Sequence, residues 1–240
     1  MIAVEIAVQD AAGARTAFEN GADRVELCQA LAETGGLTPS SGTIDAVCEV
    51  AGDATRVAVL VRPRPGGFVY AAEEIALVSA DIRDCVSRGA GGIVVGALLP
   101  DGGVDHDALR RWKDAAGDVE FVFHRAIDTL LDPAGIIDEL VELGVDRVLT
   151  SGGAARSIDG VDVLAALARQ AAGRLQIMAG GGVRVDDIPE LVGAGVDAVH
   201  LSARSRSANA APSGPGGGDT GFDVTDSSIV AAAACAVRVA

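Results

Sequence analysis

Eight short apolar segments alternate with amphipathic segments along almost the whole chain, and this alternation limits the fold more than any other feature. Strands are predicted at residues 2–8, 24–28, 57–62, 92–96, 120–124, 147–151, 175–179 and 197–202. Helices are predicted at residues 10–20, 40–51, 74–88, 105–115, 133–143, 160–172, 186–194 and 226–238. Eight such units in 240 residues match a closed (β/α)8 barrel, the TIM barrel, which takes about 250 residues.

The joints between helices and strands also repeat. The strings NGADRVEL, ELGVDRVL and GAGVDAVH each place a glycine at the end of a helix and an aspartate just before a strand. A doubly wound open sheet is the alternative, but no G-x-G-x-x-G fingerprint follows the first strand. We therefore expect residues 1–240 to form a single TIM-barrel domain.

One segment breaks the pattern. Residues 205–224, SRSANAAPSGPGGGDTGFDV, are rich in Gly, Pro, Ser and Ala and have no hydrophobic periodicity, so they predict a flexible loop. The loop follows the eighth strand, at the end of the barrel where active sites of this fold lie. Two interpretations stay open, namely a lid over a site and a disordered excursion.

Charge and hydrophobicity exclude several classes of partner. The chain has 34 acidic against 19 basic residues, a formal charge of −15 at pH 7, which disfavours nucleic acid and anionic membranes. No run of about 18 apolar residues is present, and the N-terminal stretch MIAVEIAVQD is not a signal peptide. We expect a cytoplasmic protein.

Strand alternation predicts which side chains point into the barrel. In the first strand Ile2, Val4, Ile6 and Val8 share one face, so Glu5 lies on the other. The same reasoning sends polar or small residues from the other strands into the lumen, namely Glu26, Cys28, Arg62, His124, Ser151, Gly180, His200 and Ser202. Charges there need partners, so these residues form either a functional site or a structural ion network that joins Glu5 and Glu26 to Arg62 and Arg125.

The chain resembles a known family through several well-spaced motifs. In order, they are RVELCQALAETGGLTPS, VRPRPGGFVY, FVFHRAID, RVLTSGG and IMAGGGVR, and the resemblance covers about residues 2–204. The family is that of the copper homeostasis protein CutC. The resemblance implies a (β/α)8 barrel, a role in copper handling, and cysteine ligands at the ends of the first two strands.

Copper binding depends on Cys28, which matches the second of those cysteines. Cu(I) is soft and prefers thiolate ligands, so Cys28 is the predicted metal ligand and copper(I) the predicted cofactor. Ala7 stands where the family often has the first cysteine, so half of the pair is absent. The alternative role of Cys28 is a small apolar side chain that fills the lumen.

An enzyme is the competing hypothesis for the same residues. Glu26 serves as a base, His124 as an acid or base, and Asp128 orients either one. Arg62 and Arg125 hold an anionic substrate. Loops after the seventh and eighth strands often bind phosphate in this fold, which makes Gly180, Gly181 and Ser202 candidate substrate-binding residues together with Glu5, Ser151 and His200.

The two hypotheses differ in which residues they need. Copper binding requires Cys28, whereas the enzyme requires Glu26 and His124 and tolerates Cys28→Ser. The predicted partner is accordingly a copper ion or a small anionic ligand. We also expect the barrel to form a homo-oligomer through its helices.

Overall fold

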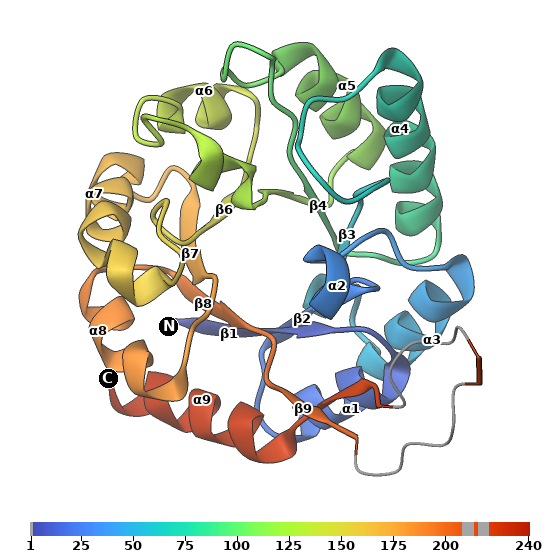
Figure 1. Cartoon of the computed structure of the whole chain (residues 1–240), viewed down its shortest axis with the longest axis vertical. Helices are drawn as coiled ribbons and strands as arrows, with labels where there is room; N and C mark the ends of the chain where they lie inside the picture. The colour runs from blue at the N-terminus through green and yellow to red at the C-terminus, as the bar shows by residue number, and fades with distance from the viewer. Residues whose placement is uncertain (1, 208–213, 216–220) are drawn as a thin grey trace.

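The computed structural model of the chain describes residues 2–207, 214–215 and 221–240. Eight parallel strands close into a barrel in sequence order, with β8 paired to β1 (Figure 1). The strands are β1 Ala3–Val8, β2 Arg24–Leu27, β3 Val57–Leu60, β4 Gly92–Val95, β5 Glu120–Phe123, β6 Arg147–Thr150, β7 Gln176–Gly180 and β8 Ala198–Leu201. Each predicted strand is present, which confirms the (β/α)8 barrel.

Helices surround the strands as an outer ring in Figure 1. The ring consists of α1 Ala11–Glu19, α3 Ser41–Ala51, α4 Ala72–Ser87, α5 His106–Ala116, α6 Ile137–Glu142, α7 Val161–Ala171, α8 Ile188–Gly193 and α9 Ser227–Val239. The sequence places the start of α6 four residues too early, because the carboxylate of Asp132 accepts a hydrogen bond from Gly135 N and closes a turn there. None of the described helices is long and apolar enough to span a bilayer.

A short helix, α2 Leu31–Thr34, was missed by the sequence patterns. It follows β2 and lies at the end of the barrel where the strands terminate. Four residues are too few for hydrophobic periodicity to appear. Gly35 ends the helix with φ +78°, a left-handed conformation that glycine adopts without strain.

The predicted loop at 205–224 has structure at both ends. β9 Arg204–Arg206 and β10 Asp223–Thr225 pair as antiparallel strands. These ends are therefore paired strands, and the flexibility of the segment stays a prediction. Its central part, residues 208–213 and 216–220, and with it the choice between lid and excursion, lies outside the described residues.

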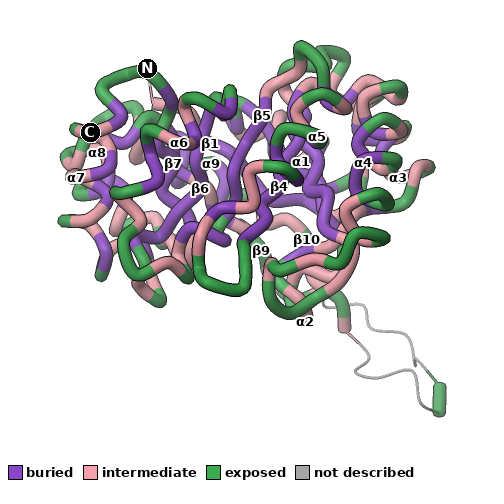
Figure 2. The backbone as a smooth tube through the Cα atoms, turned by 90° about the horizontal axis from the view of Figure 1, so that it is seen from above, coloured by how far each residue is buried: buried purple, intermediate pink, exposed green. Residues whose placement is uncertain are grey.

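The barrel separates two apolar regions. Side chains on the outer face of the strands, such as Ile6 and Val59, pack with the helices into the main core. Figure 2 shows the buried strands between partly exposed helices. Inside the lumen, two smaller clusters alternate with charged residues; they consist of Cys28, Ala58, Leu60, Val94 and Val122, and of Leu149, Met178 and Ala198.

The repeated aspartates tie neighbouring strands together where the strands begin. Each carboxylate accepts a hydrogen bond from a backbone N–H near the start of the preceding strand, and each aspartate N–H donates to the carbonyl of the same residue. The carboxylate bonds are Val4 N to Asp23 at 2.7 Å, Phe121 N to Asp146 at 2.8 Å and Ile177 N to Asp197 at 2.8 Å. This contact explains why the strings recur at three joints.

Replacing Asp197 tests this role. We expect Asp197→Ala to lower the free energy of unfolding by about 1–2 kcal/mol, because Ile177 N loses a charged acceptor. Urea denaturation measures the change. Asp114→Ala on the surface of α5 is the control and should change the free energy by less than about 0.5 kcal/mol; equal effects of the two variants would contradict the proposed role.

Candidate functional site

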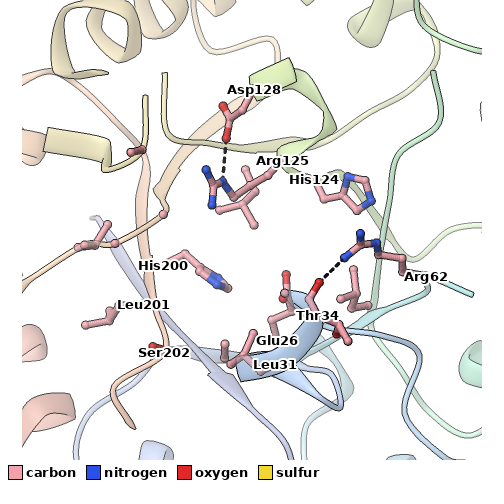
Figure 3. A pocket seen from close by; sticks show the side chains of 18 of the residues that line it. Glu26, Leu31, Thr34, Arg62, His124, Arg125, Asp128, His200, Leu201 and Ser202 are labelled. Atoms are coloured by element: carbon pink, nitrogen blue, oxygen red, sulfur yellow. Dashed lines mark hydrogen bonds and ion pairs between the residues drawn. The ribbon is translucent and has the colours of Figure 1, made fainter. Parts of the chain in front are cut away.

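A cavity of about 730 Å³ opens at the carboxyl ends of the strands. Its wall includes side chains from β1, β2, β3, β6 and β8, the loops after β5 and β7, and α2. Figure 3 shows Glu26 and His200 on one side of the cavity, with Arg125, His124 and Arg62 around it. The cavity lies where catalytic and binding residues gather in this fold.

Glu5 occupies the middle of the lumen and is completely buried. One carboxylate oxygen, Oε1, lies 2.8 Å from Nδ1 of His200, and the other, Oε2, lies 2.6 Å from Nε of Arg24 and 3.8 Å from a guanidinium nitrogen of Arg147. Burial by itself raises the pKa of Glu5, but Arg24, His200 and Arg147 outweigh it and hold the pKa at about 2. Glu5 is therefore a buried carboxylate anion.

This arrangement corrects the predicted ion network. Glu5 pairs with Arg24 and Arg147, and neither Arg62 nor Arg125 forms an ion pair with it in the described chain. Both true partners begin their strands with lumen-facing side chains, and Arg24 is the direct neighbour of Glu5 in the β1–β2 register. The strand parity that found Glu26 also applies to Arg24, so a signal was present in the sequence.

Glu26 lies above Glu5 and borders the cavity. It is 5% exposed, and its Oε2 atom has no hydrogen-bond partner among the described residues. Burial raises its pKa to about 7, with a contribution from Glu5, while His200 and Arg24 act in the opposite direction. A carboxyl group that gains and loses a proton near neutral pH therefore faces the cavity.

His200 faces Glu26 across the floor of the cavity (Figure 3). Its Nδ1 is held by Glu5, which leaves Nε2 for the cavity side. Burial lowers its pKa, but the nearby Glu26 and Glu5 outweigh this and raise the pKa overall. The imidazole is thus fixed in orientation and biased toward the cationic form.

The pKa of His124 is lowered, whereas that of His200 is raised. Its Nδ1 accepts a hydrogen bond from Ala126 N at 3.2 Å, and the ring of Phe68 lies 4.8 Å from its own ring, centroid to centroid. Burial and the cation of Arg62 lower its pKa to about 3. His124 is therefore a neutral imidazole at physiological pH, suited to hydrogen bonding and not to proton uptake.

Asp128 orients Arg125, which corrects the hypothesis that it orients Glu26 or His124. Its Oδ2 accepts a hydrogen bond from Nε of Arg125 at 2.7 Å and one from Oγ of Ser151 at 2.9 Å. Thr150 Oγ1 donates to its other oxygen at 2.5 Å. Because the carboxylate is fully engaged here, it forms no hydrogen bond with either predicted partner in the described chain.

Arg125 enters the cavity because a glycine gives it room. A side chain at Gly181 would bring its Cβ to 2.9 Å from Cζ of Arg125, and Gly181 has φ +120°. Ser151 Oγ accepts from the guanidinium at 3.1 Å. Gly180, by contrast, is required for packing, since its Cβ would lie 2.3 Å from Leu149.

Arg62 is a buried cation without a carboxylate partner in the described part of the chain. Its guanidinium donates to three backbone oxygens, Thr34 O at 2.9 Å, Gly36 O at 3.3 Å and Gly66 O at 2.7 Å, and its Cζ lies 5.1 Å from the centroid of the Phe68 ring. Its Nε has no acceptor among residues 2–207, 214–215 and 221–240. Arg62 thus holds α2 in place and leaves a positive charge beside the cavity uncompensated.

Of the remaining predicted residues, Ser202 borders the cavity, whereas Cys28 does not. Cys28 is 0% exposed and packs against Leu60, and Gly36 covers its sulfur. Burial, with Glu26 nearby, raises the pKa of its thiol far above the ordinary range. The other three cysteines lie on α3, α4 and α9, away from the lumen.

These donors do not fit Cu(I), which prefers thiolates. Cys28 is a protonated, covered thiol, and the lumen holds no second cysteine among the described residues. Glu5, Glu26 and His200 bring three possible donor atoms within 4.8 Å of one another, but these are oxygen and nitrogen. Glu5 has both oxygens committed to His200, Arg24 and Arg147, so the cluster does not form a free cation cage.

Comparison with known proteins identifies the family. The CutC family model matches residues 2–205. The chain belongs to the CutC family. A CutC family protein of Xanthomonas campestris pv. campestris (strain 8004) is 44% identical over 202 residues, which cover 84% of this chain and 83% of that protein.

Two further relatives agree. A CutC family protein of Xylella fastidiosa (strain Temecula1 / ATCC 700964) is 44% identical over 203 residues, covering 84% of this chain and 75% of that protein. The solved structure of CutC from Streptococcus agalactiae, provisionally named a copper homeostasis protein, is 31% identical, with a TM-score of 0.79. The aligned region covers 84% of this chain and 99% of that chain. The predicted CutC resemblance is therefore confirmed.

Because His124 is neutral in the folded chain, we predict that the free energy of unfolding falls as the pH is lowered. The folded-state pKa of about 3 lies below the ordinary histidine value of 6.5, so between these values the unfolded chain binds a proton that the folded chain does not. This lowers stability by up to about 1.4 kcal/mol per pH unit as the pH falls. His124→Asn keeps an acceptor for Ala126 N but does not titrate, so its stability should fall less steeply.

Urea denaturation at several values between about pH 6.5 and pH 4.5 measures this slope. His106→Asn on the surface is the matched control. The same slope in His124→Asn and in the wild type would show that His124 is not buried in its neutral form.

Proposed function

We propose that the cavity binds a small organic anion and that Glu26 exchanges a proton with it. The observation that carries the proposal is the carboxyl group of Glu26, whose Oε2 has no hydrogen-bond partner among the described residues although it is buried against the cavity. A buried polar atom without a hydrogen-bond partner costs free energy. Such atoms occur at binding sites, where a bound ligand supplies the partner.

The charge of the ligand follows from the two arginines. Arg62 has no carboxylate partner within the part of the chain that the structure describes. Asp128 holds the Nε of Arg125, whose side chain is 43% exposed. A carboxylate or phosphate group between them would pair with Arg62 and accept the free N–H groups of Arg125. The glycine-rich loop after β7, with Gly181 and Gly182, borders the same side of the cavity.

The roles of the remaining groups follow from their protonation states. Glu26, with a pKa near 7, accepts or donates a proton at physiological pH. His124 stays neutral and offers a hydrogen bond whose state does not change with pH. Ser202 and Thr34 add polar contacts at the rim, and Ser151 keeps Arg125 and Asp128 together.

Copper(I) binding is the second candidate function. It is supported by the provisional name of the S. agalactiae relative and by the presence of Cys28 in the lumen. Against it stand the protonated thiol of Cys28 and Ala7, which provides no sulfur on the first strand. The anion-binding function is therefore the better supported of the two.

We also propose a cytoplasmic location and a homo-oligomeric assembly. The four cysteines are free, as thiols are in a reducing compartment. Leu77 on α4 and Val239 on α9 are exposed apolar side chains on the outer ring, where copies of the barrel would meet. Light scattering measures the assembly state.

Phosphoglycolate, malonate and inorganic phosphate test the proposed anion site. We expect at least one of them to bind in isothermal titration calorimetry, and Arg125→Met to raise its Kd by about tenfold or more, because charge-assisted hydrogen bonds are lost. Arg110→Met on the exposed face of α5 is the matched control. No binding of any of the three anions, or equal loss in both variants, would contradict the proposal.

An anaerobic Cu(I) competition titration of the reduced protein tests the second candidate. We expect no stoichiometric binding that depends on Cys28, so Cys28→Ser and Cys48→Ser should behave like the wild type. Tight binding at one ion per chain that disappears only in Cys28→Ser would instead establish the thiol as a copper ligand.

A further inference from the structure

Glu5 and His200 form a buried carboxylate–imidazole pair whose imidazole is aimed at Glu26. The Nδ1 of His200 lies 2.8 Å from Oε1 of Glu5, and the donor atoms of Glu5, Glu26 and His200 all lie within 4.8 Å of one another. In Figure 3 the His200 ring points toward the Glu26 carboxylate. The cavity floor therefore presents two proton-transferring groups side by side, from β2 and β8.

We propose that Glu26 and His200 move protons between adjacent atoms of a small α-hydroxy carbonyl compound that carries one phosphate or carboxylate group, with Glu5 as the positioning residue for His200. This inference rests on the proposed anion site and adds the substrate class and the reaction. The anionic group binds at Arg62 and Arg125, and the carbonyl carbon and its neighbour lie over Glu26 and His200.

The step balances without a cofactor. The Glu26 carboxylate removes a proton from the carbon next to the carbonyl, and the electron pair of that C–H bond forms a C=C bond. The carbonyl π electrons move onto oxygen, which takes a proton from Nε2 of the His200 imidazolium, giving an enediol. Reversal on the other carbon returns a proton from Glu26 to carbon and one from oxygen to His200, so the products are isomers of the substrates.

The electrostatics of the floor favour this pairing. His200 has a carboxylate on each side, which raises its pKa and keeps a proton on the imidazole. Glu26 has a pKa near 7, so its carboxylate form is substantially populated at neutral pH. Proton donor and proton acceptor thus coexist at the same pH, as an enediol mechanism requires.

A bound divalent cation is the alternative use of these three residues. It would lie beside the guanidinium groups of Arg24 and Arg147, which already neutralise Glu5. It would also displace the hydrogen bond that fixes His200. The arginines beneath the floor therefore favour the proton-transfer role.

Deuterium incorporation tests the proposal directly. Dihydroxyacetone phosphate and hydroxypyruvate are the probes, and calorimetry first establishes which of them binds. We expect proton NMR in deuterium oxide to show exchange of the C–H next to the carbonyl of a bound probe. Glu26→Gln and His200→Gln should each slow this exchange by about a hundredfold or more, while calorimetry still detects binding at Arg62 and Arg125.

The controls separate failure of this inference from failure of the anion site. His106→Gln and Glu139→Gln remove the members of a His–Glu pair on the surface, at 2.9 Å, and should leave exchange unchanged. A probe that binds without exchanging, or exchange that survives in both cavity variants, overturns the proton-transfer role and leaves the anion site standing. Loss of exchange after treatment with a chelator would assign the cluster to a metal ion instead. Failure of both probes to bind overturns both proposals.

The positioning role of Glu5 has its own readout. Heteronuclear NMR follows the titration of His200, assigned with His200→Gln among the three histidines of the chain. Glu5→Gln and Glu5→Asp should both lower the pKa of His200, because one removes the charge and the other moves it away from Nδ1. An unchanged His200 titration in a folded Glu5 variant contradicts this role. Glu5→Asp keeps the negative charge that pairs with Arg24 and Arg147, so it decides if Glu5→Gln does not fold.

Discussion

The ionised carboxylate of Glu5 in the middle of the barrel is the constraint to which the rest of the lumen is fitted. A buried anion is tolerated only when it is paired and hydrogen-bonded. Glu5 forms ion pairs with Arg24 and Arg147 and a hydrogen bond with His200, which lies on the cavity side. These partners come from β2, β6 and β8, so one side chain links strands across the barrel. The same contact that stabilises the lumen also fixes the ring that faces the cavity.

The charged side chains at the two ends of the barrel differ in how they are paired. At the end where the strands begin, aspartates such as Asp23 and Asp197 bind backbone N–H groups, and Glu120 pairs with Arg24 and Arg147. Each of these side chains has a hydrogen-bond or ion-pair partner. At the opposite end, Glu26 and Arg62 are left without charged partners in direct contact among the described residues. That difference, and not burial alone, supports the proposal that the cavity binds a ligand.

Strand and helix periodicity, together with the period-two alternation of the strands, predicted the barrel and brought Glu26, His124 and His200 to one end. Pairing was predicted less well. Arg24 was overlooked although it shares the parity of Glu26, and Asp128 was assigned to the wrong neighbours because sequence spacing does not show that β6 brings Ser151 to it. The burial of Cys28 under Gly36 depends on how α2 folds back, and no local pattern encodes this.

In the proposed site, Glu26 takes up a proton when an anion binds beside it. Calorimetry of phosphoglycolate binding at about pH 7, in two buffers of different ionisation enthalpy, measures the protons taken up. An anion beside Glu26 raises the pKa of this carboxyl group, so the wild type should take up about 0.2–0.5 proton more per site than Glu26→Gln. Equal proton uptake in the two proteins would show that Glu26 does not meet the ligand.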